Sequence, residues 1–249
     1  MYTLHIANKN YSSWSLRPWL LMKELDIPFD EHLTLFEDQV NYASVKACSP
    51  TGQVPCLIDN EWVIWESLAI TEYLYEKHPP VWPSSSPARA WARSAAAEMH
   101  AGFKALRSQC PMNCGVRVRM NAIDTALQQD LTRIDELWCE GLTRFNGPFL
   151  AGANFTGVDA FFAPVVFRLQ TYGLAPSSTA NKYLTRILAL PAMKEWVLQA
   201  IVEPWREPSH EAETLATGTI TSDHRSIISW TKSRVNIYWL LLATYACAL

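Results

Sequence analysis

The stretch Ser49-Pro50-Thr51-Gly52-Gln53-Val54-Pro55, followed by the apolar run Cys56-Leu57-Ile58, is the most informative part of this chain. Proline has no N–H to donate to a sheet, so Val54 just before it can offer its own N–H and C=O to a molecule outside the fold. An X-Pro bond that enters a strand is also a candidate cis peptide bond. We therefore expect Pro55 to be cis and the residues before it to contact a small peptide.

A second polar motif, Glu66-Ser67, opens the amphipathic segment 67–77. It places a carboxylate and a hydroxyl at a helix N-terminus, where unpaired N–H groups and the helix dipole favour an anion. A ligand that carries both an amino and a carboxylate group at one end suits this corner. The γ-glutamyl group of glutathione is such a ligand.

The run Asn10-Tyr11-Ser12-Ser13-Trp14-Ser15-Leu16-Arg17 is similar to the Ser-Ser-Cys-Ser-Trp-Arg stretch of zeta-class glutathione S-transferases, the maleylacetoacetate isomerases. Trp14 stands where that class has Cys. Together with the two motifs above, the first 80 residues resemble the thioredoxin-like domain of a glutathione S-transferase. Residues 1 to about 210 fit that family's two-domain layout, and the resemblance implies a homodimer.

Periodicity along the first 80 residues predicts an α/β thioredoxin-like domain, a mixed four-stranded sheet with three helices. The predicted strands are 3–7, 29–36, 55–59 and 62–65, and the predicted helices are 14–25, 41–48 and 67–77. Pro18 is expected in about the first turn of its helix, where a missing N–H does little harm.

Residues 81–87, rich in Pro and Ser, are predicted to be a linker. From 88 to 210 we expect an all-α C-terminal helical domain without further strands. Its predicted helices are 88–108, 121–145, 157–172, 180–189 and 191–202. Residues 211–249 are an extension whose structure the sequence does not decide. Its apolar end, 237–249, is shorter than the roughly 20 residues that a membrane-spanning helix needs. A packed extension, a disordered tail, a tail anchor and a coding-frame artefact are the alternatives there.

Composition favours a soluble cytoplasmic protein. The 249 residues have a net charge of −3 and are 49% hydrophobic, and no basic patch points to nucleic acid or a membrane as partner. The N-terminus lacks the pattern of a signal peptide, so the six Cys are expected to be free, buried thiols. No His lies close enough in sequence to Cys110 and Cys114 to complete a zinc pattern, and we expect no metal site there.

A glutathione transferase must convert a thiol with a pKa near 8.5 into a thiolate at neutral pH. A hydroxyl at the start of the first helix can donate a hydrogen bond to the sulfur, and the helix dipole adds to its effect. Alignment to the family pattern makes Ser12 the first choice for the catalytic donor and Ser13 the second. Ser12 also suits a plain N-cap, and Tyr11 is expected to be a wall of the site.

The resemblance also implies the remaining site residues. Those expected to bind glutathione are Trp14, Lys46, Gln53, Val54, Pro55, Glu66 and Ser67. The pocket for the second substrate is expected to be lined by Tyr11, His100, Phe103 and Arg107. Arg17 could add positive potential, or could form a salt bridge to the second domain.

The expected function is that of a serine-type glutathione S-transferase, with glutathione as co-substrate and a small-molecule electrophile as second substrate. Peroxide reduction is a further activity of such a site. One alternative is glutathione-dependent cis–trans isomerisation of the maleylacetoacetate type, in which Arg107, Arg117 or Arg119 would hold a carboxylate. Another is a non-catalytic binding module of the same fold.

The pattern Thr156-Gly157-Val158-Asp159 predicts an N-terminal capping motif at the start of a very apolar helix. The family has a similar motif, and we expect it to serve folding. Replacing Asp159 by Ala should then cost about 1 kcal/mol of stability without altering the chemistry.

Overall fold

The computed structural model describes residues 1–35, 46 and 49–225. The predicted helix 41–48 lies outside these residues except for Lys46, which is helical and exposed. The predictions for 226–249 also fall outside them.

The N-terminal domain contains the predicted mixed sheet, with strand order β2-β1-β3-β4. Strand β1 (Tyr2–Ile6) pairs in parallel with β2 (Phe29–Leu33). Strand β3 (Cys56–Asp59) is antiparallel to β1 and forms a hairpin with β4 (Trp62–Trp65). Asn60 in the hairpin turn adopts a positive φ of 54°, which Asn tolerates better than most residues.

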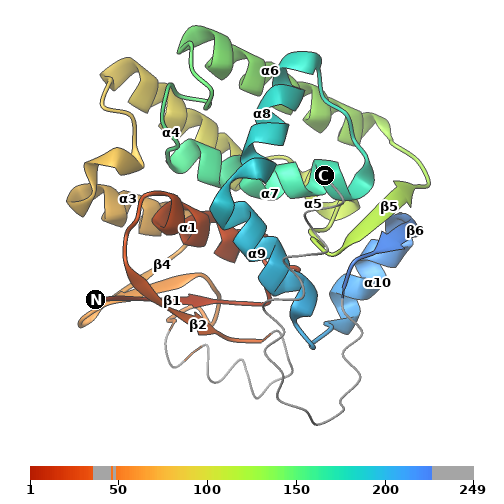
Figure 1. Cartoon of the computed structure of the whole chain (residues 1–249), viewed down its shortest axis with the longest axis horizontal. Helices are drawn as coiled ribbons and strands as arrows, with labels where there is room; N and C mark the ends of the chain where they lie inside the picture. The colour runs from red at the N-terminus through yellow and green to blue at the C-terminus, as the bar shows by residue number, and fades with distance from the viewer. Residues whose placement is uncertain (36–45, 47–48, 226–249) are drawn as a thin grey trace.

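Two helices of this domain, α1 (Ser13–Glu24) and α3 (Ser67–Lys77), lie between the sheet and the helical domain (Figure 1). Helix α1 buries an apolar stripe that includes Leu16, Trp19 and Leu20. Pro18 lies in the second turn of α1 rather than the first, because the helix begins at Ser13.

The helical domain follows a short 3-10 turn at Pro79–Val81. Its helices are α4 (Ser86–Ala101), α5 (Lys104–Gln109), α6 (Thr125–Arg144), α7 (Gly157–Tyr172), α8 (Ser178–Ala189) and α9 (Pro191–Val202). The predicted helix 88–108 is two helices, since Phe103 adopts a left-handed φ of 55° that interrupts it. Helix α7 is buried along nearly its whole length and packs against both α1 and α4.

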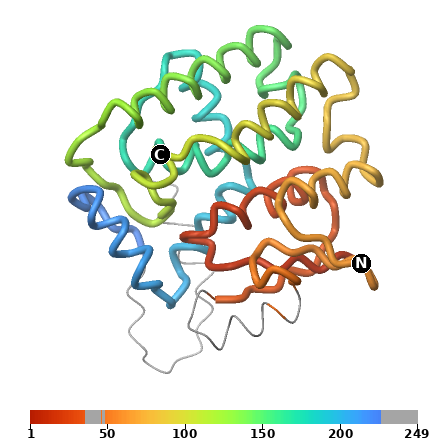
Figure 2. The backbone as a smooth tube through the Cα atoms, turned by 180° about the vertical axis from the view of Figure 1, so that it is seen from behind, coloured from red at the N-terminus to blue at the C-terminus, as the bar shows by residue number. Residues whose placement is uncertain are grey.

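The expectation of a second domain without strands is wrong. Strand β5 (Val116–Met120) pairs antiparallel with β6 (Gly218–Asp223), and helix α10 (Pro208–Thr217) leads into β6. These elements lie side by side at the edge of the helical domain (Figures 1 and 2). The described part of the C-terminal extension is therefore a packed one.

A buried polar loop joins β1 to α1 and ties the two domains together. Asn10 donates to the Asn113 side chain (2.9 Å), and its own side-chain oxygen accepts from the Gly115 N–H (3.0 Å). The Lys9 N–H donates to Glu203 after α9 (2.8 Å). Since Tyr11 and Ser12 follow directly, the second domain fixes where the start of α1 lies.

The predicted capping motif is present at the start of α7. Asp159 is fully buried and accepts hydrogen bonds from the Thr156 N–H (2.9 Å), the Leu150 N–H (3.0 Å) and the Tyr183 hydroxyl (3.1 Å). Burial raises the pKa of Asp159 to about 6, although these hydrogen bonds oppose the shift. The motif lies inside the helical core, in keeping with a role in folding.

Candidate active site

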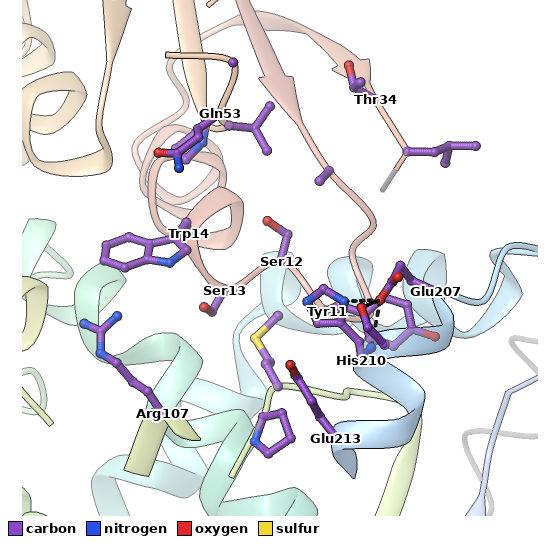
Figure 3. Close-up of a pocket in the computed structure, with 18 of the residues that line it drawn as sticks. Tyr11, Ser12, Ser13, Trp14, Thr34, Gln53, Arg107, Glu207, His210 and Glu213 are labelled. Atoms are coloured by element: carbon purple, nitrogen blue, oxygen red, sulfur yellow. Dashed lines mark hydrogen bonds and ion pairs between the residues drawn. The ribbon is translucent and has the colours of Figure 1, made fainter. Parts of the chain in front are cut away.

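A pocket of about 950 Å³ opens between the two domains at the start of α1. Its walls include the β1–α1 loop, the loop before β3, the α4–α5 region and the start of α10 (Figure 3). The predicted site residues that line it are Tyr11, Ser12, Ser13, Trp14, Gln53, Val54, Pro55, Glu66, His100 and Arg107.

Ser12 is the N-cap of α1, and its oxygen accepts from the Ser15 N–H (3.4 Å). The Ser12 hydroxyl donates to Ser15 Oγ (2.7 Å), which also accepts from the Ala7 N–H (3.1 Å). The Ser13 hydroxyl makes no hydrogen bond within residues 1–35, 46 and 49–225. Both serines therefore lie in the pocket at a helix N-terminus, where the dipole favours negative charge.

Tyr11 is a wall of the pocket whose hydroxyl is already committed. It donates to Glu211 on α10 (2.7 Å), and its ring stacks on His210 with centroids 5.2 Å apart. Burial, with the hydrogen bond to Glu211, raises the pKa of Tyr11 to about 12. A phenol held in this way is a poor donor to a second anion.

Trp14 lies between two guanidinium groups. The Arg17 guanidinium is 4.2 Å from the centre of its ring system and that of Arg107 is 4.7 Å away. Burial lowers the pKa of Arg17, and the nearby charges of Arg107 and Arg168 lower it further. This cluster gives one side of the pocket a positive potential.

Arg17 was expected either to add positive potential or to form a salt bridge to the second domain. It does contact the second domain, but its partner there is an aromatic ring and not a carboxylate. Its guanidinium lies 4.7 Å from the Phe161 ring centre and donates to Ser67 Oγ (3.4 Å). Within the part of the chain that the structure describes, Arg17 Nε is buried without a hydrogen-bond partner. The side chain is thus a fixed buried charge beside the start of α1.

The two motifs that motivated the sequence interpretation meet at this pocket. The Val54-Pro55 peptide bond is cis, as predicted, and the residues on both sides of it line the pocket. Glu66 is exposed toward the pocket with a φ of 68°, and its carboxylate lies 4.0 Å from His100 Nε2. Burial, followed by the charge of Arg17, lowers the pKa of His100.

Three predicted site residues lie outside the pocket lining. Ser67 is fully buried behind Glu66, where it contacts Arg17. Phe103 belongs to the core at the start of α5. Lys46 is exposed.

Several lining residues were not predicted to form the site: Arg168, Glu207, Ser209, His210 and Glu213. Arg168 is on the buried helix α7, and four others are at or near the start of α10. The sequence carries one local signal for the latter group, because Glu207-Pro208 followed by His210 is a helix start with an acceptor three residues before the His. Nothing in it indicates that this helix would reach the pocket.

Cys56, Cys110 and Cys114 are buried, as expected, and Cys139 is half-buried. Burial raises the pKa of both Cys110 and Cys114 to about 12. The described residues contain no group of three or more His, Cys, Asp or Glu side chains that could hold a metal ion. Across the same residues, no helix combines the length and the apolar character that a membrane crossing requires.

The fold and the pocket define a two-domain protein of the thioredoxin-like class, with its site at the junction of the domains. Two family models match this chain: "Glutathione S-transferase, N-terminal domain" over residues 11–77 and "Glutathione S-transferase, C-terminal domain" over residues 89–198. The chain belongs to the glutathione S-transferase family, whose enzymes use glutathione as co-substrate.

Relatives of known name agree with this assignment. A probable maleylacetoacetate isomerase from Caenorhabditis elegans is 27% identical over 191 residues, covering 72% of this chain and 85% of that protein. A Burkholderia glutathione transferase homologue, solved with bound glutathione, has a TM-score of 0.58 at 23% identity and covers 80% of this chain and 97% of its own. Glutathione transferase Omega 3C from Trametes versicolor has a TM-score of 0.62 at 17% identity, with coverages of 86% and 90%. At these identities the two solved structures support the fold alone.

Proposed function

We propose that this glutathione transferase uses the hydroxyl of Ser12 to stabilise the glutathione thiolate for attack on a small electrophile. The observation that carries the proposal is the place of Ser12: it lines the pocket at the N-terminus of α1, next to the cis Val54-Pro55 loop. A thiolate there would meet a hydrogen-bond donor and the positive end of a helix dipole.

The capping role of Ser12 is compatible with this chemistry. A hydroxyl has one donor and two acceptor lone pairs, so its oxygen can keep accepting from the Ser15 N–H while its hydrogen turns toward a sulfur. Ser15 Oγ, now the acceptor from Ser12, can donate to Ser12 in return. Arg17 and Arg107 on either side of Trp14 would favour the anion further.

In this proposal glutathione is held by the polar groups that gather at the N-terminal domain. Glu66 would accept from its amino group, while Gln53 and Val54 would pair with its backbone. Trp14 would form the floor beside the cysteinyl part. Ser67 and Lys46 lie outside the lining. Ser67 would act through Arg17, and Lys46 would contact the far end of the peptide.

Titration of the bound thiol by ultraviolet absorbance tests the proposal. Wild type should ionise glutathione well below its solution pKa, and Ser12→Ala should raise the bound thiol's pKa by about 1 unit or more, as expected for loss of a hydrogen bond to a charged group. Ser12→Thr keeps the hydroxyl and should behave as wild type. A matched Ser13→Ala variant that alone raises the pKa would assign the donor to Ser13, and absence of glutathione binding would remove the catalytic proposal.

A second candidate, cis–trans isomerisation of a dicarboxylate, is supported by Arg107 and Arg168 in the pocket wall and by the similarity to a probable maleylacetoacetate isomerase. Arg117 and Arg119, on β5, do not line this pocket. Turnover of a cis-unsaturated dicarboxylate that consumes no glutathione would favour this activity over conjugation.

We also propose a homodimer, supported by the exposed apolar side chains of Trp62, Val63 and Trp65 on the edge strand β4. Exposed apolar side chains on an edge strand are typical of a protein contact.

A further inference from the structure

The start of α10 forms a carboxylate–imidazole pair in the pocket wall. Glu207 Oε2 lies 2.5 Å from His210 Nδ1 and also accepts from the His210 N–H (2.7 Å) and the Ser209 hydroxyl (2.7 Å). Both members of the pair line the pocket. Burial works to raise the pKa of Glu207, but these hydrogen bonds outweigh it and hold that pKa at about 2, so the carboxylate is charged at neutral pH.

The imidazole is fixed on its other side as well. The Tyr11 ring stacks on it with centroids 5.2 Å apart at an angle of 30°, and Tyr11 is itself anchored to Glu211. In Figure 3, Ser12 and Ser13 lie between this wall and the wall formed by Trp14 and Arg107. A ring so oriented, in the wall of the pocket that Ser12 also lines, has the arrangement of a proton-transfer group.

We infer that His210, oriented by Glu207, is a catalytic acid that delivers a proton to the second substrate as glutathione adds to it. The inference rests on the proposed function, since it assumes that a thiolate forms beside Ser12. This role concerns electrophiles whose adduct must be protonated, such as α,β-unsaturated carbonyl compounds.

The proposed addition conserves protons and electrons. The thiolate forms a C–S bond to the β-carbon, and the electron pair of the C=C bond moves onto the carbonyl to give an enolate. The protonated imidazole of His210 gives its Nε2 proton to the enolate, while Glu207 keeps the ring fixed through Nδ1. The neutral imidazole then regains a proton from water, which balances the proton that the glutathione thiol released. No oxidant or reductant takes part.

Two substrates separate this role from a structural one. With a chlorodinitrobenzene, the thiolate displaces chloride and the product takes up no proton. With methyl vinyl ketone, the product requires one. His210→Gln should lower kcat for the ketone by at least about 100-fold, within the range usual for general acid catalysis, and change kcat for the aryl chloride by less than twofold.

Two further variants sharpen the comparison. Glu207→Gln should lower kcat for the ketone by a smaller factor with little change in KM, because the imidazole remains but is no longer held by a charge. His224→Gln, the same substitution at an exposed His in the same C-terminal segment and outside the pocket lining, should leave both activities unchanged. Thermal denaturation and glutathione binding of each variant report whether α10 is still folded.

Each outcome of these measurements supports or overturns the role of His210. Equal losses for the two substrates in His210→Gln would mean that His210 only shapes the wall or caps α10, and would overturn the inference. So would unchanged turnover of the ketone, or a wild type that turns over the aryl chloride and not the ketone. If wild type turns over neither substrate and does not lower the pKa of bound glutathione, the proposed function itself fails, and the inference with it.

Discussion

At the scale of single residues, the start of α1 shows how one side chain can serve the fold and the chemistry. Ser12 closes the helix through its oxygen, while its hydrogen, donated to Ser15 Oγ in the structure, can turn toward a ligand. In the proposed mechanism, activation of the thiol then needs no side chain beyond those that a helix start already favours. The plain N-cap interpretation and the catalytic one are therefore both compatible with the geometry.

Asp159 is a residue whose replacement should cost more stability than a helix cap alone. It is fully buried and accepts from two backbone N–H groups and two hydroxyls, those of Thr156 and Tyr183. Asp159→Ala should lower the free energy of unfolding by about 3 kcal/mol at pH 7, more than the roughly 1 kcal/mol expected from a cap alone, because buried donors lose their acceptor. Asp124→Ala, which removes an exposed cap of α6, is the matched control at about 1 kcal/mol. Equal losses in urea denaturation would contradict this.

The same carboxyl gives the stability a predictable pH dependence. The pKa of Asp159 is about 6 in the folded protein and about 3.9 in an unfolded chain, so the folded state binds more protons between these values. Its contribution is therefore full below pH 3.9 and is lost as the pH rises through 6. The stability difference between wild type and Asp159→Ala should be about 2 kcal/mol larger at pH 4.5 than at pH 7. A difference that grows with pH would show that the carboxyl is ionised more easily than its burial indicates.

At the scale of elements, α10 matters most, because it completes the pocket from outside the two matched family models. Glu211 joins it to the rest of the molecule by accepting from the Tyr11 hydroxyl (2.7 Å) and the Asn113 side chain (3.3 Å) and by pairing with Arg225. The substrate wall that carries His210 is thus held by contacts to both domains.

Tyr11→Phe tests that arrangement. Because the Tyr11 hydroxyl is committed to Glu211, its removal should leave the pKa of bound glutathione unchanged and should speed amide hydrogen exchange in α10 (208–217). The expected stability loss is about 1 kcal/mol. Hydrogen exchange with mass spectrometry and the thiol titration measure the two effects. A raised thiol pKa would make Tyr11 the donor in place of Ser12.

At the scale of the whole molecule, the edge strand β4 is the surface to examine for self-association. Trp62 is 63% exposed and Trp65 41% exposed, and both lie on the outermost strand of the sheet. Light scattering should find wild type as a dimer, and Trp62→Arg should weaken dimerisation by roughly 10- to 100-fold, as expected when an interface aromatic is lost. Trp205→Arg, at a 39% exposed Trp between α9 and α10, is the control. A monomeric wild type at micromolar concentration would rule out this dimer.

Much of this molecule could be predicted locally. The hairpin 55–65, the helix 67–77 and the apolar helix 157–172 follow from periodicity and caps within short windows, and the structure places them within a residue of their predicted bounds. The cis Val54-Pro55 bond was also predicted from the motif around it, and the structure confirms it. In each case, neighbours in the chain supply the decisive interactions.

Other features depend on partners far away in the chain. Val-Arg-Val-Arg-Met at 116–120 alternates like a strand, but it becomes one only by pairing with 218–223, about a hundred residues later. Arg17 looks like any helical surface charge until Phe161 and Ser67 enclose it. His210 lies in the pocket because Tyr11 and Glu211 bring α10 there.

The sequence by itself thus determined the family and the thioredoxin-like sheet, and it predicted the side of the pocket that would hold glutathione, since these rest on compact motifs. Only the tertiary structure decided which side chains face them from the second domain and from α10. The physical reason is that helical periodicity tells which face of a segment is buried, whereas the segment buried against it is selected by packing across the whole molecule.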